Sequence, residues 1–239
     1  MNTSSSPSVF RISVLAMCFS LSLALIHAQR TTAPTITFTC DFPGSEPAYY
    51  EITVSPDGHG SYSSRSNPSA LHDPAKSSDA ALETEESYRT DFNIPESTST
   101  QIFDLAKHAN YFAGQVDSGK KKVASTGAKT LSYKAVGQNT QASYDHSSIP
   151  AIQELTTIFQ SLSTTLEFGR RLDYDLHYQK LALDEELKRM EEMASAGSLS
   201  ELSAAAPILR KIADDPTIIN LSRSRAQRLL ARSGPQTSR

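Results

Sequence analysis

The spacing of apolar residues changes near residue 148, and this change limits the folds open to the chain. Before it, apolar residues mostly alternate with polar ones, as at Ile36, Phe38 and Cys40, which is the period of a strand with one buried face. After it, they recur every three or four residues, as on one face of a helix. We therefore predict an α+β fold: a small antiparallel sheet of hairpins with packed helices over residues 29–148, then a helical region over 149–232 that packs on it or forms an arm.

Turn residues separate the alternating segments of the first part. Pro56-Asp57-Gly58 follows the extended run that ends at Val54, and there proline fixes its own φ angle while glycine accepts a positive one. A second turn is expected at Gly137, between two further extended runs. Pro95 precedes residues that favour the start of a helix. The first part is thus predicted to hold hairpins and one helix.

Two apolar stripes follow residue 148. The first is expected to pack on the sheet and consists of Ile152, Leu155, Phe159, Leu162 and Leu166. The second is turned well away from the first and consists of Leu172, Leu176, Leu183, Leu187 and Met190. Two interpretations stay open: the helix breaks near Gly169, or one long helix presents successive faces to two partners.

Cap residues predict where the later helices begin. Ser198 and Glu201 have the spacing of a capping box, in which serine caps a helix and glutamate lies three residues on. Pro207 falls within the apolar pattern that follows and is expected to kink or split that helix. Asp214-Asp215-Pro216 is expected to start the last helix, about residues 217–232, whose apolar face holds Ile219, Ala226 and Leu230.

The two ends of the chain are expected to lie outside the fold. Arg11 precedes an apolar run that ends near Ala28, which is the pattern of a secretory signal over residues 1–28. The run is shorter than the roughly 20 apolar residues of a membrane span. Cleavage near Ala28 removes one arginine and changes the formal net charge from −3 to −4. The signal pattern predicts a secreted or periplasmic protein. The tail, residues 233–239, is predicted to be disordered.

Composition and motifs argue against several function classes. The mildly negative charge disfavours nucleic acid as a partner. The segment from Ser125 to Thr130 resembles the end of a phosphate-binding loop, but Ala128 interrupts the Gly-Lys-Thr order, so we interpret it as a polar turn. The histidines lack the spacing of metal ligands, and neither a cofactor nor a metal is predicted. Cys40 is interpreted as a buried small hydrophobic residue, with an intermolecular disulfide or a reactive thiol as the alternatives.

Catalytic residues are not recognisable in the sequence. Asp145-His146 ends a predicted strand, where a catalytic pair could lie, but no nucleophile accompanies it. Carboxylates such as Glu154 and Glu167 are interpreted as exposed helix positions, although the fold could bring two acids together, as in glycosidases, with Asp145 or Glu154 among the acids used. An envelope hydrolase with an acid or histidine site is therefore the alternative hypothesis. Tyrosines of the first part could form an aromatic binding surface, but we interpret them as packing residues, namely Tyr49, Tyr50, Tyr62 and Tyr88.

Arginines gather near the C-terminus. Residues 222–239 hold five arginines and no acid, whereas the rest of the chain after the signal is acidic. Arg225, Arg228 and Arg232 share the side of the predicted last helix that lies opposite its apolar face. Arginines near a helix C-terminus favour its dipole and often form an ordinary solvated face. The functional hypothesis is a contact between these arginines and anionic lipid headgroups or an acidic protein surface.

Several stretches resemble a set of secreted bacterial proteins with no assigned function. They are residues 42–47, 57–62, 125–133, 155–162 and 181–187. The resemblance implies export and a bacterial envelope setting, and it supplies no active site. With the lack of a site motif and the extended helical arm, the leading hypothesis is an exported non-catalytic protein that binds another macromolecule. Its partner would be an envelope protein or an anionic membrane surface, and its oligomeric state is not predicted.

Overall fold

The computed structural model describes residues 33–66, 87–119 and 124–233. The predicted signal lies outside these residues, as does the predicted tail apart from Ser233. None of the described helices is long and apolar enough to cross a membrane.

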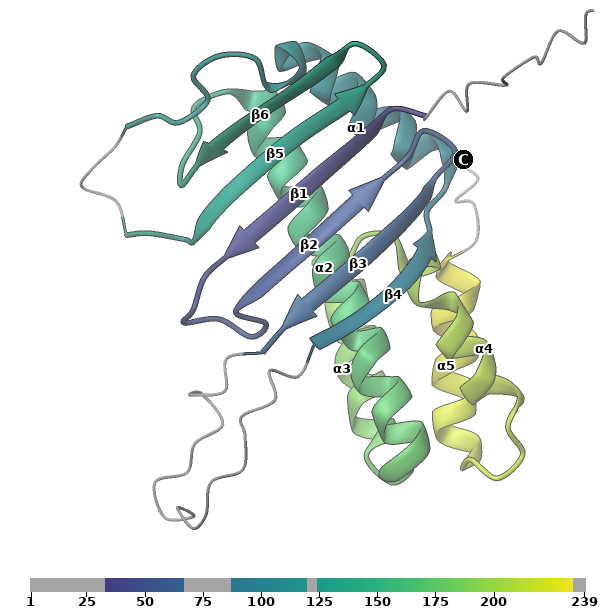
Figure 1. The fold of residues 1–239 in the computed structure, drawn as a ribbon. Helices are drawn as coiled ribbons and strands as arrows, with labels where there is room; N and C mark the ends of the chain where they lie inside the picture. The colour runs from purple at the N-terminus through teal and green to yellow at the C-terminus, as the bar shows by residue number, and fades with distance from the viewer. Residues whose placement is uncertain (1–32, 67–86, 120–123, 234–239) are drawn as a thin grey trace, which may run out of the picture. The chain divides into compact units, whose positions relative to one another are not determined.

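Six antiparallel strands form one sheet in the order β4-β3-β2-β1-β5-β6 (Figure 1). They are β1 (Thr35–Asp41), β2 (Tyr49–Val54), β3 (His59–Arg65), β4 (Ser87–Asn93), β5 (Ala128–Ala135) and β6 (Gln138–Tyr144). The predicted turns join β2 to β3 and β5 to β6, and their glycines, Gly58 and Gly137, have φ angles of 81° and 76°. An L side chain is strained in this region, which explains glycine at both turns.

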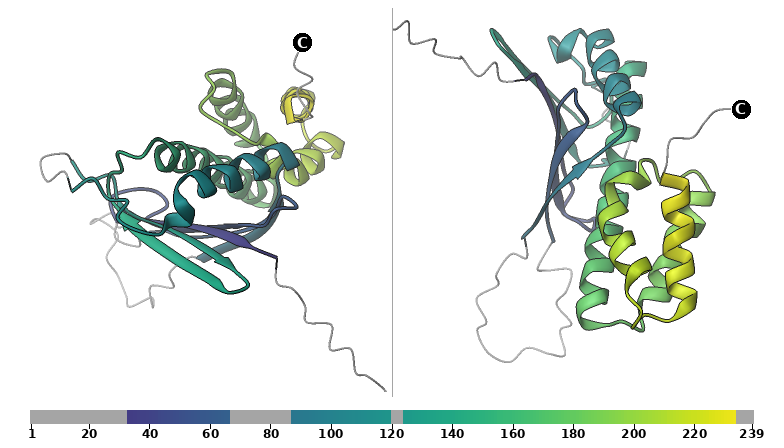
Figure 2. Two further views of the ribbon diagram at one scale, coloured as in Figure 1. Left: turned by 90° about the horizontal axis from the view of Figure 1, so that it is seen from above. Right: turned by 90° about the vertical axis from the view of Figure 1, so that its right-hand side faces the viewer.

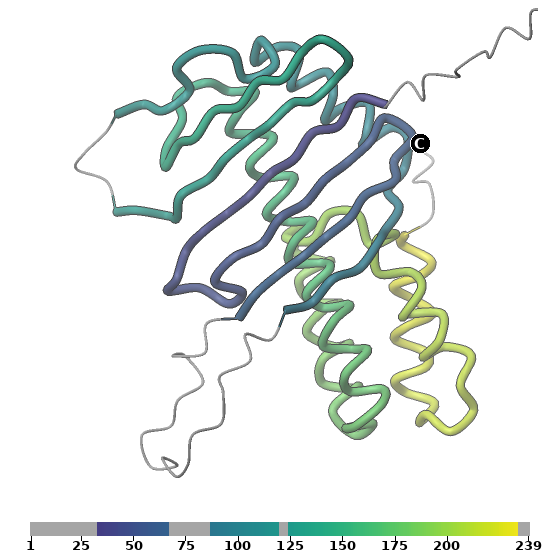
Figure 3. The backbone as a smooth tube through the Cα atoms, in the orientation of Figure 1, coloured from purple at the N-terminus to yellow at the C-terminus, as the bar shows by residue number. Residues whose placement is uncertain are grey.

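The register of the strands separates an apolar face from a polar one. Phe38 on β1 lies between Ile52 on β2 and Leu131 on β5, and all three side chains are buried. One residue along, Thr37 lies between Thr53 and Ser132 and points to the opposite face. Figure 3 follows this pairing along the backbone. The alternation predicted from the sequence therefore produces one face that needs cover and one that can contact water.

Helices cover the apolar face and then continue past the sheet (Figure 2). They are α1 (Glu96–His108), η3 (Asn110–Phe112), α2 (Pro150–Tyr178), α3 (Leu183–Ser195), η4 (Leu202–Ala205), α4 (Ala206–Asp214) and α5 (Asn220–Ser233). The first predicted stripe of α2 is fully within the sheet core, where the ring of Phe159 stacks on Phe38 at 5.1 Å between centroids. The α+β fold with a helical C-terminal region is thus confirmed.

Helix α2 is continuous through Gly169, which decides between the two interpretations of its apolar stripes. Its second half contributes Phe168 and Leu172 to a separate core, together with Leu183 of α3 and residues of η4, α4 and α5. The break comes instead between Tyr178 and Leu183. A single long helix therefore belongs to two hydrophobic cores.

Two cap predictions were wrong. Glu201 has a φ angle of 55° and accepts a hydrogen bond from Thr98 at 2.6 Å, so Ser198 and Glu201 do not form a capping box. The last helix begins at Asn220 rather than near residue 217, because the Asp215 carboxylate holds the amide and hydroxyl of Thr217 in a turn.

Two details concern the later helices. Pro207 does split its helix as predicted, since η4 ends before it and α4 carries it in its first turn. On α5, Ala226 and Leu229 are fully buried, whereas Leu230 is partly buried and Ile219, just before the helix, is exposed.

Candidate functional site

Exposed apolar side chains gather in one part of the molecule. Among the described residues, seven large apolar side chains are exposed. Two of them, Phe42 and Val136, lie in turns of the sheet. The other five lie on the second half of α2, at the α2–α3 and α4–α5 connections, or at the start of α5, and are Tyr174, Tyr178, Leu181, Ile219 and Leu221. Scattered exposed apolar residues are ordinary, but a concentration of them marks a contact surface.

The two connections lie side by side at the end of the helical region (Figure 1). Lys180 joins them, because its Nζ donates to Thr217 Oγ1 at 2.8 Å and lies 3.5 Å from the Asp215 carboxylate. Leu181 follows Lys180 and is 91% exposed. We call Leu181, Ile219 and Leu221 the apolar end. A leucine this exposed contributes nothing to the core, so the fold does not explain it.

Charges of both signs surround the apolar end and pair with one another. Lys180 approaches Asp215, and Lys211 lies 3.8 Å from Asp173. Hydrogen bonds from Thr217, followed by the charge of Lys180, lower the pKa of Asp215. Asp214 lies next to Asp215, and Arg223 donates to the carbonyl of Ala213 and to the side chain of Asn220 at the same connection. The apolar end therefore has a border of mixed charge.

A cavity of about 330 Å³ opens beside α2, one helical turn before the apolar end. We call it the tyrosine pocket. Its walls include Tyr88 from β4 and, from α2, Arg170, Asp173, Tyr174, His177 and Tyr178. The rings of Tyr174 and Tyr178 lie 5.0 Å apart, and Tyr88 packs edge-on against the buried ring of Tyr62 at 6.3 Å.

A buried hydrogen-bond network lies beneath the tyrosine pocket. Glu167 is 4% exposed, so its prediction as an exposed helix position was wrong. Its carboxylate accepts hydrogen bonds from Tyr62, Ser64 and Arg170, each at 2.7 Å. Burial, followed by the charge of Glu167, raises the pKa of Tyr62 far above its usual range. Arg170 is also 3.8 Å from Glu46, so two carboxylates compensate its charge. The network fixes Arg170 in the pocket wall.

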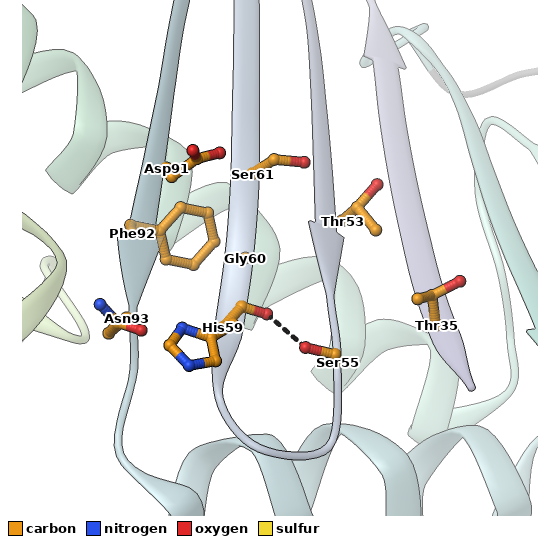
Figure 4. Close-up of a pocket in the computed structure, with 9 residues that line it drawn as sticks. All are labelled: Thr35, Thr53, Ser55, His59, Gly60, Ser61, Asp91, Phe92 and Asn93. Atoms are coloured by element: carbon orange, nitrogen blue, oxygen red, sulfur yellow. Dashed lines mark hydrogen bonds between the residues drawn. The ribbon is translucent and has the colours of Figure 1, made fainter. Parts of the chain in front are cut away.

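A second cavity, of about 440 Å³, lies on the open face of the sheet (Figure 4). His59, Ser61 and Asp91 line it and are residue types that hydrolases use. Within the described residues, however, no hydrogen bond joins the Ser61 hydroxyl to His59 or Asp91. His59 instead accepts a hydrogen bond at its carbonyl from Ser55, and its ring lies 4.0 Å from Asp57. This arrangement does not activate Ser61 as a nucleophile.

The predicted acids have separate structural partners. Asp145 accepts a hydrogen bond from the Thr126 amide at 3.0 Å, which lowers its pKa, and it lies 3.7 Å from the His146 ring. The buried Lys129 donates to the carbonyl oxygens of Thr126, Gly127 and Asp145, so its ammonium group ties the polar turn to the end of β6. On α2, Glu154 accepts from Gln101 at 2.7 Å. Among the residues that the structure describes, Asp145 and Glu154 share no hydrogen-bond partner.

The three predicted arginines face α3. Arg225 donates to Asp184 at 2.9 Å and to Glu191 at 2.7 Å, and Arg228 donates to Glu191 at 2.8 Å. Arg232 donates to the hydroxyl of Ser195 at 2.8 Å. Burial alone would raise the pKa of Glu191, but the hydrogen bonds and charges of Arg228 and Arg225 lower it overall. These arginines hold α5 on α3, so any outside anion would compete with Glu191 for two of them.

Other candidates from the sequence serve the core. Cys40 is free and buried, and burial raises the pKa of its thiol, which agrees with a small hydrophobic residue. Tyr50 and Tyr62 are buried as expected, whereas Tyr88 lines the tyrosine pocket. Within the described ranges, no group of histidine, cysteine, aspartate and glutamate gathers as a metal site would require.

Sequence reasoning missed the exposed apolar residues at the end of α2 and just after it. Tyr174, Tyr178 and Leu181 are spaced four and three residues apart, which places the two tyrosines on one helical face. That face differs from the buried one, which holds Leu172. The sequence signal that could have identified them is a second apolar stripe beside the stripe that the core buries. The chain matches no protein-family model, and no curated protein matches its sequence.

Proposed function

We propose that this chain is an exported, non-catalytic protein of the bacterial envelope that binds another envelope protein through its apolar end. The observation that carries the proposal is the exposure of Leu181, Ile219 and Leu221 at adjoining turns of the helical region. Export rests on the signal pattern that ends near Ala28 and on the resemblance to secreted bacterial proteins.

The exposed leucines and isoleucine support binding because water contact with apolar surface is unfavourable. Burial of such surface against a partner stabilises the complex by roughly 25 cal/mol per Å² of apolar surface. The sheet offers a contrast within the same chain, since its open face carries Thr37, Thr53 and Ser132 rather than apolar residues. A surface left apolar beside polar surroundings favours a partner that covers it.

The charges around the apolar end favour a protein partner over an anionic membrane. Acidic lipid headgroups attract basic segments, whereas the charges near the apolar end are of both signs, and Lys180 and Lys211 already lie beside Asp215 and Asp173. Arg225 and Arg228, the basic residues that could draw the protein to a membrane, already bind Glu191 and Asp184. A protein surface with an apolar centre and a mixed polar rim complements this end better.

The non-catalytic part of the proposal is supported by the two candidate catalytic sites, namely the predicted acids and the cavity that contains Ser61. In the part of the chain that the structure describes, neither has the arrangement that catalysis requires. The hydrolase hypothesis requires acids or a histidine that share one reacting centre. Asp145 holds a turn, Glu154 binds Gln101, and Ser61 has no hydrogen bond to a base within the described residues.

The binding test compares the apolar end with a matched exposed site. The parent protein, L181D/L221D and V136D are labelled and titrated with the envelope fraction of the source organism, with and without protease treatment of that fraction. Val136 is 75% exposed in the β5–β6 turn, away from the helical region, and this exposure lies between those of Leu181 and Leu221, so V136D places one aspartate at a comparable position of the sheet. We expect saturable, protease-sensitive binding that L181D/L221D weakens about tenfold or more and that V136D leaves within twofold.

Three outcomes would contradict the binding proposal. They are binding that both variants reduce equally, binding that neither variant changes, and association with protein-free anionic vesicles as strong as with the untreated fraction. Export is tested separately by mass spectrometry of the protein from its source, which should find an N-terminus near Gln29. An intact Met1 in the cytoplasmic fraction would contradict export.

A further inference from the structure

We propose that the tyrosine pocket binds a neutral saccharide unit. This inference does not rest on the function of the apolar end, because its residues and its ligand chemistry are different. Tyr88, Tyr174 and Tyr178 would supply ring faces, while hydroxyl and carboxylate groups of the walls would bind the sugar hydroxyls.

The tyrosine rings are available to a ligand. Tyr174 is 49% exposed and Tyr178 is 75% exposed, and neither hydroxyl has a hydrogen-bond partner among the described residues. The two rings lie 5.0 Å apart with an angle of 44° between their planes, so they form two sides of a corner rather than a closed stack. Tyr88 is fixed from behind by Tyr62, which makes its ring a rigid wall. Amphipathic rings of this kind suit a ligand with both apolar and polar edges.

The charges of the pocket already have partners, which favours a neutral ligand. Arg170 is paired with Glu167 and Glu46. Asp173 lies 3.8 Å from Lys211 and 3.9 Å from the ring of His177. An anion would have to compete for Arg170, and a cation would meet the guanidinium group in the same wall. A neutral ligand avoids both costs.

Size and wall chemistry narrow the class to saccharides. The cavity, about 330 Å³, is at the lower end of the roughly 300–1,000 Å³ of ligand pockets, which suits one small ring unit rather than an extended apolar ligand. A pyranose ring has C–H groups on its faces and hydroxyls at its edge. Tyrosine faces match the former, while Asp173, Ser66 and Ser87 match the latter.

Calorimetric titration of the full protein tests the saccharide proposal. The neutral probes are cellotetraose, maltotetraose and the tetramer of N-acetylglucosamine, and the charged probes are inorganic phosphate and tetramethylammonium. The variants are Y174A/Y178A and, as the matched control, Y49A, whose half-buried ring lies under Arg65 on the open face of the sheet. We expect saturable binding of at least one neutral probe, weakened about tenfold by Y174A/Y178A and within twofold of the parent for Y49A.

Any of three outcomes would overturn the saccharide proposal. They are that no neutral probe binds, that a charged probe binds more tightly than every neutral one, or that Y174A/Y178A binds as well as the parent while its unfolding midpoint is unchanged. L181D/L221D should retain saccharide binding, because Leu181 and Leu221 do not line the pocket. That variant separates failure of the saccharide site from failure of the apolar end.

Discussion

The sheet core and the helical core share helix α2, yet the two regions differ in the kind of side chain that they leave in contact with water. The sheet core combines aromatic rings such as Phe38, Tyr62 and Phe159 under two helices, and its open face is polar. The helical core is built mainly from leucine, isoleucine and alanine of α2, α3, α4 and α5. It ends in turns that leave Leu181 and Ile219 in water.

The difference shows where exposed apolar groups gather: among the described residues, five of the seven lie in the helical region, and the sheet has Phe42 and Val136 in its turns. In the sheet, the side that contacts water uses serine and threonine at successive register positions. In the helical region, polar side chains would serve equally well at residue 181 or 219, because neither contributes to the core. The apolar end is therefore where function, rather than folding, best explains the sequence.

The largest expected effects come from truncation in the two cores. F159A should lower the free energy of unfolding by roughly 3–5 kcal/mol, and L172A by roughly 2–5 kcal/mol, since both side chains are fully buried. Because α2 joins the cores, both variants should shift one common transition in urea, followed by circular dichroism and by tyrosine fluorescence. Q160A, at an exposed position of α2, should stay within about 0.5 kcal/mol. Two separate transitions would mean that the cores unfold independently.

A medium effect is expected where α5 meets α3. Because the arginine pairs depress the pKa of Glu191, its contribution to stability is present above the ordinary value of 4.5 and is lost as the pH falls below it. E191Q should cost roughly 1–2 kcal/mol at neutral pH, and its stability should fall less steeply below about pH 4.5 than that of the parent. E192Q, at an exposed neighbour, should keep the parent's pH profile. Identical profiles of stability against pH for the parent and E191Q would show that the Glu191 pairs do not stabilise the contact between α3 and α5.

A small stabilisation is expected at the point where α2 passes from one core to the other. A Cβ at residue 169 would lie 3.9 Å from Ile208 Cγ2 and 4.0 Å from Ala205 Cβ, which are ordinary contacts. Since glycine in a helix interior is less favourable than alanine, G169A should raise the free energy of unfolding by about 0.5–1 kcal/mol. Destabilisation in urea would indicate that α2 needs flexibility at Gly169.

The smallest effect on stability is expected at the apolar end itself. L181D and V136D both replace an exposed side chain, so each should change the free energy of unfolding by less than about 0.5 kcal/mol. Thermal unfolding of the two variants beside the parent measures this directly. A large loss for L181D alone would show that Leu181 supports the fold and would withdraw the reason for assigning it to binding.

Much of the fold could be predicted from the sequence because its apolar residues recur with the period of a strand in the first part and of a helix in the second. The alternation at Ile36 and Phe38 and the stripe from Ile152 to Leu166 gave the buried faces correctly. The caps were less predictable: Glu201 turned to Thr98 on another element, and such a long-range hydrogen bond has no local signature. Continuity through Gly169 also depended on packing, because Ile208 and Ala205 lie against that glycine.

The apolar end and the tyrosine pocket were harder to predict from the sequence than the fold, for a physical reason. Periodicity identifies residues that the core buries, whereas Leu181 and Tyr178 are informative because nothing buries them. Arg225 and Arg228 have no acidic residue on their own helix, and their partners Asp184 and Glu191 lie on a different helix that folding brings opposite them. Tyr88 was interpreted as a packing residue, and its role in a pocket wall became visible only with α2 in place.

Site-specific photo-crosslinking tests the proposed role of the apolar end most directly. A photoreactive amino acid is placed at residue 181 in one protein and at residue 136 in another, and each is irradiated with the envelope fraction of the source organism. The proposal predicts one discrete protein adduct from residue 181, lost on addition of excess unlabelled parent but not of excess L181D/L221D, and no such adduct from residue 136. The same adducts from both positions, or none from residue 181, would contradict it.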